Sequence, residues 1–242
     1  MTKSKRIVVV TGGSRGLGLV IAQVCAARGY SLVIGGRDAA ALEAAAAELS
    51  RPGAAVRPVA GDITEAATRE RLLATARDLG GLDVLVNNAS ELGAIGPLAD
   101  FDVPRFGRLF PVNAGAPMVL TQLALPLLKA RRGLVVNITS DAAVAAYPGW
   151  GAYGATKAAL ELLTRTLAAE LSGDGVSAVL VDPGDMRTRM HQQAFPGEDI
   201  SDRPLPEVTI PFWHWLLDQD PMAITGRRFA AQHEEASWLQ PA

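Results

Sequence analysis

Short runs of β-branched and apolar residues alternate along the chain with longer stretches rich in alanine and leucine. Six runs bounded by glycine, proline or aspartate read as strands: residues 6–11, 31–36, 55–60, 83–89, 134–140 and 176–182. Five stretches between them have the apolar spacing of helices: residues 17–28, 39–49, 65–79, about 105–130 and 153–171. A late run at residues 228–231 predicts an edge strand. This alternation predicts a doubly wound α/β fold, with a parallel sheet of about seven strands and helices on both faces.

The strand runs are apolar almost throughout, which is typical of strands covered on both faces. No shift in composition and no internal repeat divides the chain, so residues 1–242 are predicted to form a single domain. From residue 183 to residue 211 the regular pattern gives way to Pro, Asp, Gly and Arg. Long loops inside compact domains are usually functional, so this segment is expected to be a loop or lid over the substrate.

Composition narrows the partners that such a domain can have. The chain carries 23 Lys and Arg against 25 Asp and Glu, and 49% of its residues are hydrophobic. This composition excludes disorder, and it lacks the basic field needed for binding nucleic acid or an anionic membrane. A single cysteine, Cys25, and three scattered histidines predict neither a disulfide nor a metal site. The apolar run at residues 7–10 is too short for a signal peptide, and no stretch of about eighteen apolar residues is found, so a cytoplasmic protein is expected.

A glycine-rich turn follows the first predicted strand and leads into the next helix. It reads TGGSRGLG from Thr11 to Gly18. Glycines there let the backbone approach a pyrophosphate, whose charge is met by free N–H groups at the helix N-terminus. The spacing differs from the GxGxxG fingerprint, but its position after the first strand favours a phosphate cradle over an ordinary turn.

The end of the second strand indicates which dinucleotide binds. Folds that select NAD usually place an acidic residue there for the ribose 2′-hydroxyl. This chain has Gly36 and then Arg37, and Arg15 stands just before Gly16 of the cradle. Two guanidinium contacts at roughly 1.5–3 kcal/mol each would favour NADP over NAD by at least tenfold. We therefore expect NADP(H) as the cofactor.

A tyrosine and a lysine lie four residues apart at the start of a predicted helix, so Tyr153 and Lys157 share one face. Ser140 at the end of the preceding strand and Asn113 in the long helix before it complete a constellation. A ketone that accepts hydride needs a proton on its developing alkoxide, and a phenol with an ordinary pKa near 10 is a poor partner at neutral pH. A lysine roughly 4 Å away would lower that pKa by about three units. A serine hydroxyl would polarise the carbonyl, and an asparagine amide would fix a water that passes protons to the lysine.

Taken in order along the chain, these motifs resemble the short-chain dehydrogenase/reductase family, in its short single-domain branch. The ordered set is TGGSRGLG, Asp62 after the third strand, NNA at Asn87, Asn113, Ser140, YGATK at Tyr153, and Pro183-Gly184 with Thr188. The resemblance implies a Rossmann-like fold, an NADP-dependent oxidoreductase that acts on a ketone or secondary alcohol, and a homodimer or homotetramer. It implies that Tyr153 is the general acid and base, that Lys157 lowers its pKa and binds the nicotinamide ribose, that Ser140 orients the carbonyl, and that Asn113 anchors the proton relay.

The same resemblance implies the cofactor-binding residues. Asp62 would contact the adenine, Asn88 the adjacent ribose, and Thr188 the carboxamide. The full set is Gly12, Ser14, Arg15, Gly16, Leu17, Gly18, Arg37, Asp62, Ile63, Asn88, Tyr153, Lys157, Pro183, Gly184 and Thr188. Two residues depart from the family pattern: Ser90 stands where NNAG has its glycine, and Pro111 would bend the helix that carries Asn113.

Two alternatives stay open beside the NADP-dependent ketone reductase. One is a non-catalytic NADP-binding module, although such a module would not need Tyr153, Lys157 and Ser140 together. The other is an NAD-linked alcohol dehydrogenase of the same family. The expected pocket walls are Asp141, Tyr147, Trp150, Met186 and Met190, with Glu91 and Leu92 nearby, a mixture that fits many mid-sized ketones or alcohols.

Overall fold

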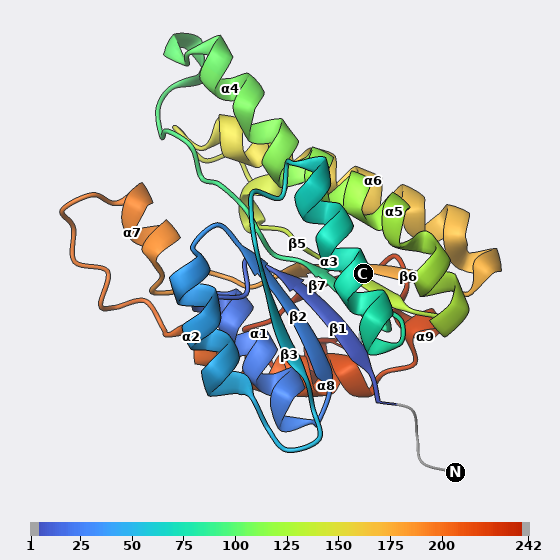
Figure 1. Cartoon of the computed structure of the whole chain (residues 1–242). Coiled ribbons are helices and arrows are strands. Elements are labelled where there is room, and N and C mark those ends of the chain that lie inside the picture. Colours follow the sequence, from blue (N-terminus) through green and yellow to red (C-terminus); the bar gives the residue numbers. More distant parts are fainter. Residues whose placement is uncertain (1–4, 239–242) are drawn as a thin grey trace.

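The computed structural model describes residues 5–238, apart from the side chain of Arg105. Within these residues seven strands form one sheet (Figure 1). They are β1 (Ile7–Thr11), β2 (Ser31–Gly36), β3 (Val56–Ala60), β4 (Val84–Asn87), β5 (Leu134–Ile138), β6 (Ser177–Asp182) and β7 (Arg228–Ala230). Their order in the sheet is β3-β2-β1-β4-β5-β6-β7, and every neighbouring pair is parallel. The predicted parallel sheet and its late edge strand are confirmed.

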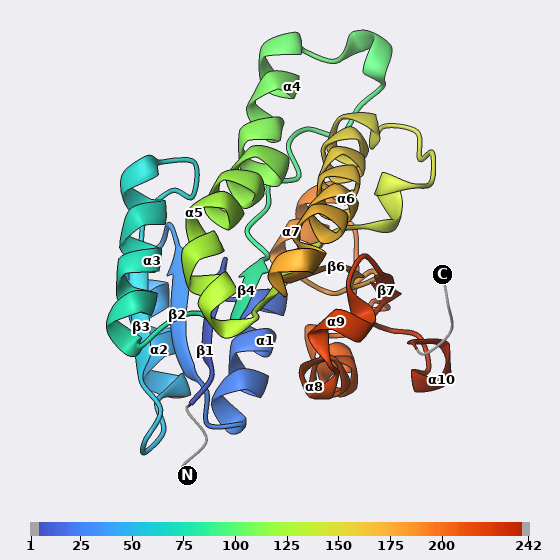
Figure 2. The ribbon, with the colours of Figure 1, turned by 90° about the vertical axis from the view of Figure 1, so that its right-hand side faces the viewer.

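Helices connect the strands on both faces, as predicted. The long ones are α1 (Gly16–Ala27), α2 (Ala39–Leu49), α3 (Ala66–Leu79), α5 (Ala116–Arg131) and α6 (Gly151–Leu171). Shorter ones are α4 (Val103–Phe110), α7 (Arg189–Ala194), α8 (Ile210–Asp218), α9 (Pro221–Ile224) and α10 (Glu235–Trp238). Figures 1 and 2 show α3, α5 and α6 on one side of the sheet and α1, α2 and α8 on the other.

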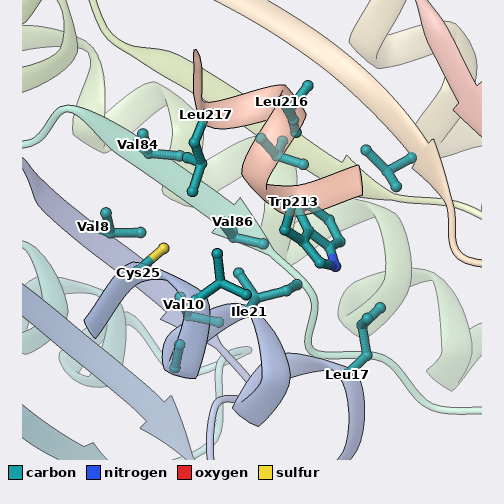
Figure 3. Close-up of a cluster of buried hydrophobic side chains, with 14 of the residues drawn as sticks. Val8, Val10, Leu17, Ile21, Cys25, Val84, Val86, Trp213, Leu216 and Leu217 are labelled. Atoms are coloured by element: carbon teal, nitrogen blue, oxygen red, sulfur yellow. The ribbon is translucent and has the colours of Figure 1, made fainter. Parts of the chain in front are cut away.

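Alternate residues of each strand supply two separate cores, because successive side chains of a strand point to opposite faces. Val8 and Val10 of β1 pack with α1, α2 and α8, and Figure 3 shows Val8 beside Cys25 and Val10 beside Ile21. Ile7 and Val9 instead pack with α3, α5 and α6. The strands are therefore apolar along their whole length because helices cover both faces.

The long helical stretch before β5 is interrupted where Pro111 stands. Residues Pro111–Gly115 form a single π-helical turn between α4 and α5, in keeping with a proline that removes one α-helical hydrogen bond. The stretch Phe106–Arg131 is long and apolar enough to cross a membrane by length and hydropathy, which differs from the sequence expectation. However, its Leu120, Ala124 and Leu128 are buried against the sheet, as in the core helix of a globular domain.

The segment expected to be an irregular loop from residue 183 to residue 211 is partly helical. It contains α7 and a 3-10 turn at Pro206–Thr209, and α8 already begins at Ile210. Thr188 starts α7 by accepting a hydrogen bond from the backbone N–H of His191. The prolines at 196, 204 and 206 limit regular structure without preventing these short turns.

Candidate active site

An open cleft of about 740 Å³ lies at the carboxyl ends of the central strands, where the strand order reverses between β1 and β4. Ligands of doubly wound sheets bind at this crevice. Every predicted cofactor-binding residue except Gly184 lines it: Gly12, Ser14, Arg15, Gly16, Leu17, Gly18, Arg37, Asp62, Ile63, Asn88, Tyr153, Lys157, Pro183 and Thr188. The fold thus gathers into one cleft residues that are spread over most of the chain.

The turn between β1 and α1 has the form of an anion cradle. Gly12 and Gly16 have φ angles of 68° and 53°, a left-handed conformation that glycine adopts without steric cost. A Cβ at Gly18 would lie 2.1 Å from the carbonyl oxygen of Gly12, so only glycine lets the helix pack on the turn. No side chain caps the N-terminus of α1 and no acidic residue stands in its first turn within the described chain. Its N–H groups therefore suit the pyrophosphate of a dinucleotide.

Asn88 and Asp62 form the walls on either side of this cradle. The amide of Asn88 donates to the carbonyls of Thr11 at 2.8 Å and Gly12 at 3.2 Å, which fixes the turn against the end of β4. Asp62 accepts from the hydroxyl and the backbone N–H of Thr64 at 2.7 and 2.8 Å. These hydrogen bonds hold the pKa of Asp62 below its usual value, so the carboxylate is charged at the cleft.

The two arginines expected to bind a 2′-phosphate already have carboxylate partners. Arg15 pairs with Asp38 at 2.8 Å and Arg37 pairs with Glu91 at 2.5 Å. Asp38 also caps α2 by accepting from the N–H of Ala41. Asp38 is an acid two residues beyond the end of β2, near the place where folds that select NAD carry one. Each guanidinium has five N–H donors, so both arginines keep donors for a further ligand.

Tyr153 and Lys157 lie together on the inner side of α6, as their spacing predicts. They are 8% and 2% exposed. The Lys157 ammonium lies 5.6 Å from the centre of the Tyr153 ring and donates to the carbonyl of Ile138 at 2.8 Å. Because Ile138 ends β5, this bond ties α6 to the strand that leads to Ser140.

The electrostatics of this pair differ from the expectation. Burial raises the pKa of Tyr153 above its ordinary value, hydrogen bonding with Ser90 opposes the rise, and Asp182 adds to it. Burial also lowers the pKa of Lys157 to about 8, against an upward effect of Asp182. The overall shift of the Tyr153 pKa is therefore upward, opposite in direction to the lowering expected from Lys157. The loss of hydration on burial is the largest cause of this shift.

Asn113 is buried in the π-helical turn and has no free hydrogen-bonding capacity. Its Oδ1 accepts from the Ser90 hydroxyl at 3.0 Å and from the N–H of Glu91 at 2.8 Å. Its Nδ2 donates to the carbonyl of Glu91 at 2.8 Å and to the Thr156 hydroxyl at 3.0 Å. The amide thus joins the end of β4 to α6, and the expectation that it also fixes a water does not fit. Ser90, singled out only as a departure from the family pattern, is a partner of both Asn113 and Tyr153.

A second pocket of about 290 Å³ opens beside Tyr153 and shares Thr139, Pro183 and Thr188 with the cleft. Ser140 and Gly184 line this pocket. So do Asp141, Tyr147, Trp150, Met186, Met190 and Leu92, as expected, whereas Glu91 lines the cleft. The Ser140 hydroxyl donates to Asp141 at 3.0 Å and accepts from the N–H of Ala142 at 3.2 Å, so it also caps the short turn after β5.

The segment after β6 borders both cavities. Met186, Thr188 and Met190 line the cleft and the second pocket alike. Arg187 and Arg189 line only the cleft. A movement of this segment would therefore affect access to both.

A buried ionic group beneath the second pocket was not predicted from the sequence. Glu161 continues the four-residue spacing of Tyr153 and Lys157 along α6 and is 1% exposed. It pairs at 2.8 Å with Arg228 of β7, which lies 67 residues away in the chain. The spacing of Glu161 was visible in the sequence, but the approach of Arg228 depends on the pairing of β7 with β6.

Comparison with known proteins agrees with this geometry. The family model described as short chain dehydrogenase matches residues 6–199. A 1-deoxy-11-beta-hydroxypentalenate dehydrogenase of Streptomyces exfoliatus is 37% identical over 191 residues, which cover 77% of this chain and 70% of that protein. A short chain dehydrogenase structure from Salmonella enterica serovar Typhi is similar with a TM-score of 0.88 at 30% identity, covering 95% of this chain and 97% of that one. An alcohol dehydrogenase from the archaeon Thermococcus sibiricus, complexed with 5-hydroxy-NADP, gives a TM-score of 0.83 at 28% identity and covers 98% and 99%.

These similarities extend over the sheet and the residues that meet in its cleft. The matched range includes the glycine cradle, Asn113, Ser140, Tyr153 and Lys157. The chain is accordingly an oxidoreductase that uses a nicotinamide cofactor to interconvert hydroxyl and carbonyl groups, and it belongs to the short-chain dehydrogenase/reductase family.

Proposed function

We propose that this protein is an NADP(H)-dependent reductase of ketones, working reversibly on the corresponding secondary alcohols. The observation that carries the proposal is the meeting of two cavities at Tyr153, one large enough for a dinucleotide and one suited to a small organic substrate. A substrate carbonyl in the second pocket would lie against both Tyr153 and Ser140.

In this mechanism Tyr153 donates its hydroxyl proton to the oxygen of the reacting carbonyl. The bound cofactor supplies the hydride, or accepts it in the reverse direction. The raised pKa of Tyr153 leaves the phenol protonated at neutral pH but makes it a weaker acid, so the reaction depends on stabilising the phenolate as it forms. Ser140 turns its hydroxyl from Asp141 to the carbonyl oxygen and polarises it. Lys157 holds a positive charge near the phenol, whose conjugate base forms as the proton leaves.

The preference for NADP(H) rests on Arg15 and Arg37. Both line the cleft, and both keep free N–H donors beside their carboxylate partners. A 2′-phosphate would share these guanidiniums with Asp38 and Glu91. We expect NADPH to bind at least tenfold tighter than NADH, since one charge-assisted contact is worth roughly 1.5–3 kcal/mol.

Fluorescence titration with NADPH and NADH tests this preference. Arg37→Asp should reverse it, and Arg57→Asp, an exposed arginine on β3 outside the cleft, is the matched control that should leave it unchanged. Equal affinities in the unaltered protein would favour an NAD-linked alcohol dehydrogenase instead. The ion pairs of Arg15 and Arg37 are the observation that keeps this second candidate open, because both carboxylates would repel a phosphate.

A panel of ketones and secondary alcohols, followed by NADPH absorbance, tests the activity itself. If none of them is turned over while NADPH binds tightly, the result would favour a non-catalytic NADP-binding module.

We further propose that the protein is cytoplasmic and acts as a homodimer or homotetramer on a small-molecule substrate. Its near-neutral charge and the exposed apolar side chains of α5 and α6 support this proposal.

A further inference from the structure

One guanidinium joins three separate elements beneath the substrate pocket. Nη2 of Arg228 donates to the backbone carbonyl of Ser140 at 3.2 Å and to the Asp182 carboxylate at 3.0 Å. Nε of the same side chain donates to Glu161 at 2.8 Å. Ser140 follows β5, Asp182 ends β6 and Glu161 lies on α6. Arg228 therefore connects both strand ends that form the pocket floor with the helix that carries Tyr153.

Glu161, which accepts from Nε of Arg228, also forms hydrogen bonds with other residues. Glu161 is almost completely buried, and its Oε1 also accepts from the Thr139 hydroxyl at 2.9 Å. Its Oε2 accepts from Arg165 at 3.0 Å. A buried carboxylate is costly unless it is paired and hydrogen-bonded, and Arg228 and Thr139 both bond to the same oxygen of Glu161.

Asp182 links this group to the reacting residues. It lines the second pocket, and its Oδ1 accepts from the N–H of Gly184 at 3.0 Å, which fixes the start of the segment over the substrate. Asp182 raises the pKa of both Tyr153 and Lys157, because a nearby negative charge disfavours phenolate and favours ammonium. Arg228 forms an ion pair with this carboxylate at 3.0 Å.

We propose that Arg228 is a positioning residue of the active site: it holds the Ser140 backbone and balances the Asp182 charge beside Tyr153 and Lys157. The inference rests on the proposed function, since it assigns Arg228 to the same reacting groups. An arginine suits the task because its planar fork bonds a carbonyl and two carboxylates at once. A lysine would supply the charge at one point only.

The proposal predicts two separable effects of changing Arg228. Arg228→Gln removes the charge and most of the fork, so turnover of an accepted ketone should fall about tenfold or more while the KM for NADPH changes less than about twofold. Arg228→Lys keeps the charge but loses the fork, so it should lower turnover without changing the protonation of Lys157.

Arg165→Gln is the matched control, because Arg165 shares Glu161 with Arg228 but has no bond to Ser140 or Asp182 among the described residues. It should leave turnover and titration as they are.

The charge effect is measured without substrate or cofactor, by NMR titration of protein labelled with [13Cε]lysine. The chain has only four lysines, Lys3, Lys5, Lys129 and Lys157, so Lys157→Met assigns the signal. Asp182 is the charged group that acts on Lys157, with Arg228 as its partner, while Asp141 acts with Asp182 on Tyr153. Removal of the Arg228 charge leaves the negative charge of Asp182 unopposed, so the titration midpoint of Lys157 should rise by at least about half a pH unit. Asp182→Asn should lower it, and the double variant should return it toward the original value.

An unchanged titration midpoint of Lys157 in Arg228→Gln would overturn the charge-balancing role, and unchanged turnover in the same variant would overturn the positioning role. Should Arg228→Gln fail to fold, Arg228→Lys decides, because unchanged turnover there contradicts the positioning role and a loss of turnover supports it. If the original protein reduces no ketone, the proposed function fails, while the NMR titration still tests the role of Arg228.

Discussion

Tyr153 illustrates how burial sets the chemistry of a single residue. A phenol that loses its hydration becomes a weaker acid, and the hydroxyls of Ser90 and Ser140 restore only part of the stabilisation of its charged form. In ketone reduction the phenol is therefore protonated, as a donor must be, but its proton is transferred less readily than from a phenol with an ordinary pKa. In alcohol oxidation the same residue must first be deprotonated, so oxidation should be favoured as the pH rises.

The first prediction at this scale is the effect of Tyr153→Phe. The ring still packs at the start of α6, but the proposed proton donor is lost. General acid catalysis is worth roughly 10²–10⁴-fold, so turnover should fall by at least the lower figure while NADPH affinity changes little. Steady-state kinetics and fluorescence titration measure the two quantities. A variant that keeps more than about a tenth of the original turnover, with chemistry shown to be rate-limiting by a deuterated-NADPH isotope effect, would remove Tyr153 from the mechanism.

The second prediction concerns the buried ammonium of Lys157. Its pKa is about 8 in the folded protein against an ordinary value of 10.5. Below pH 8 both states carry the proton, and the folded state bears the full cost of burying the charge. Between pH 8 and 10.5 the folded state loses the proton first, so this group should increase the free energy of unfolding by up to about 3 kcal/mol over that window.

Lys157→Met should abolish this rise. Urea unfolding of both proteins at pH 7, 9 and 10.5 compares their pH slopes, which are more informative than absolute stability because methionine leaves the Ile138 carbonyl without its donor. Parallel slopes for the two proteins would show that Lys157 is not held with a lowered pKa.

At the scale of elements, the contact between α1 and the turn after β1 depends on the absence of one side chain. Gly18 stands within the first turn of α1, where alanine would ordinarily favour the helix. At this position alanine is disfavoured, because its Cβ would meet the backbone carbonyl of Gly12, which cannot rotate away as a side chain could.

We therefore expect Gly18→Ala to lower the free energy of unfolding by roughly 1–3 kcal/mol and to weaken cofactor binding, since the helix must move from the cradle. Gly173→Ala is the control, because a Cβ at Gly173 meets no atom within 4 Å. Denaturant unfolding and NADPH titration of both variants provide the comparison. Equal effects of the two substitutions would contradict the assigned packing role of Gly18.

The elements were predictable from sequence to different degrees. Strands and long helices were found because both cores are built from regular apolar spacing, as in β1 and α6. The turn at Pro111 and the helix α7 were less accessible, since a π-helical turn and a six-residue helix leave almost no periodic signal. In the site, the residues that share a motif were predicted, and contacts between distant residues, such as Arg37 with Glu91, were not.

At the scale of the whole molecule, several large apolar side chains of α5 and α6 stay exposed after the sheet has been covered. Helices α5 and α6 pack against each other on the same side of the sheet, as Figure 2 shows. Leu162 of α6 is 64% exposed, and Val119 and Leu123 of α5 are also exposed. Neither core cluster contains these side chains, so they do not stabilise the single chain by burial.

The last prediction is that these exposed side chains of α5 and α6 lie where copies of the chain associate. A two-fold axis beside α5 and α6 would bring the same apolar side chains of both copies together, which removes them from water without a second kind of surface. Light scattering at micromolar concentration should then give a dimer or tetramer. Leu162→Glu places a charge in that contact and should shift the protein toward monomer, whereas Val208→Glu, at an exposed position before α8, should leave the assembly intact. A stable monomer for the unaltered chain would show that α5 and α6 face solvent, and Leu162→Glu would then leave the measured mass unchanged.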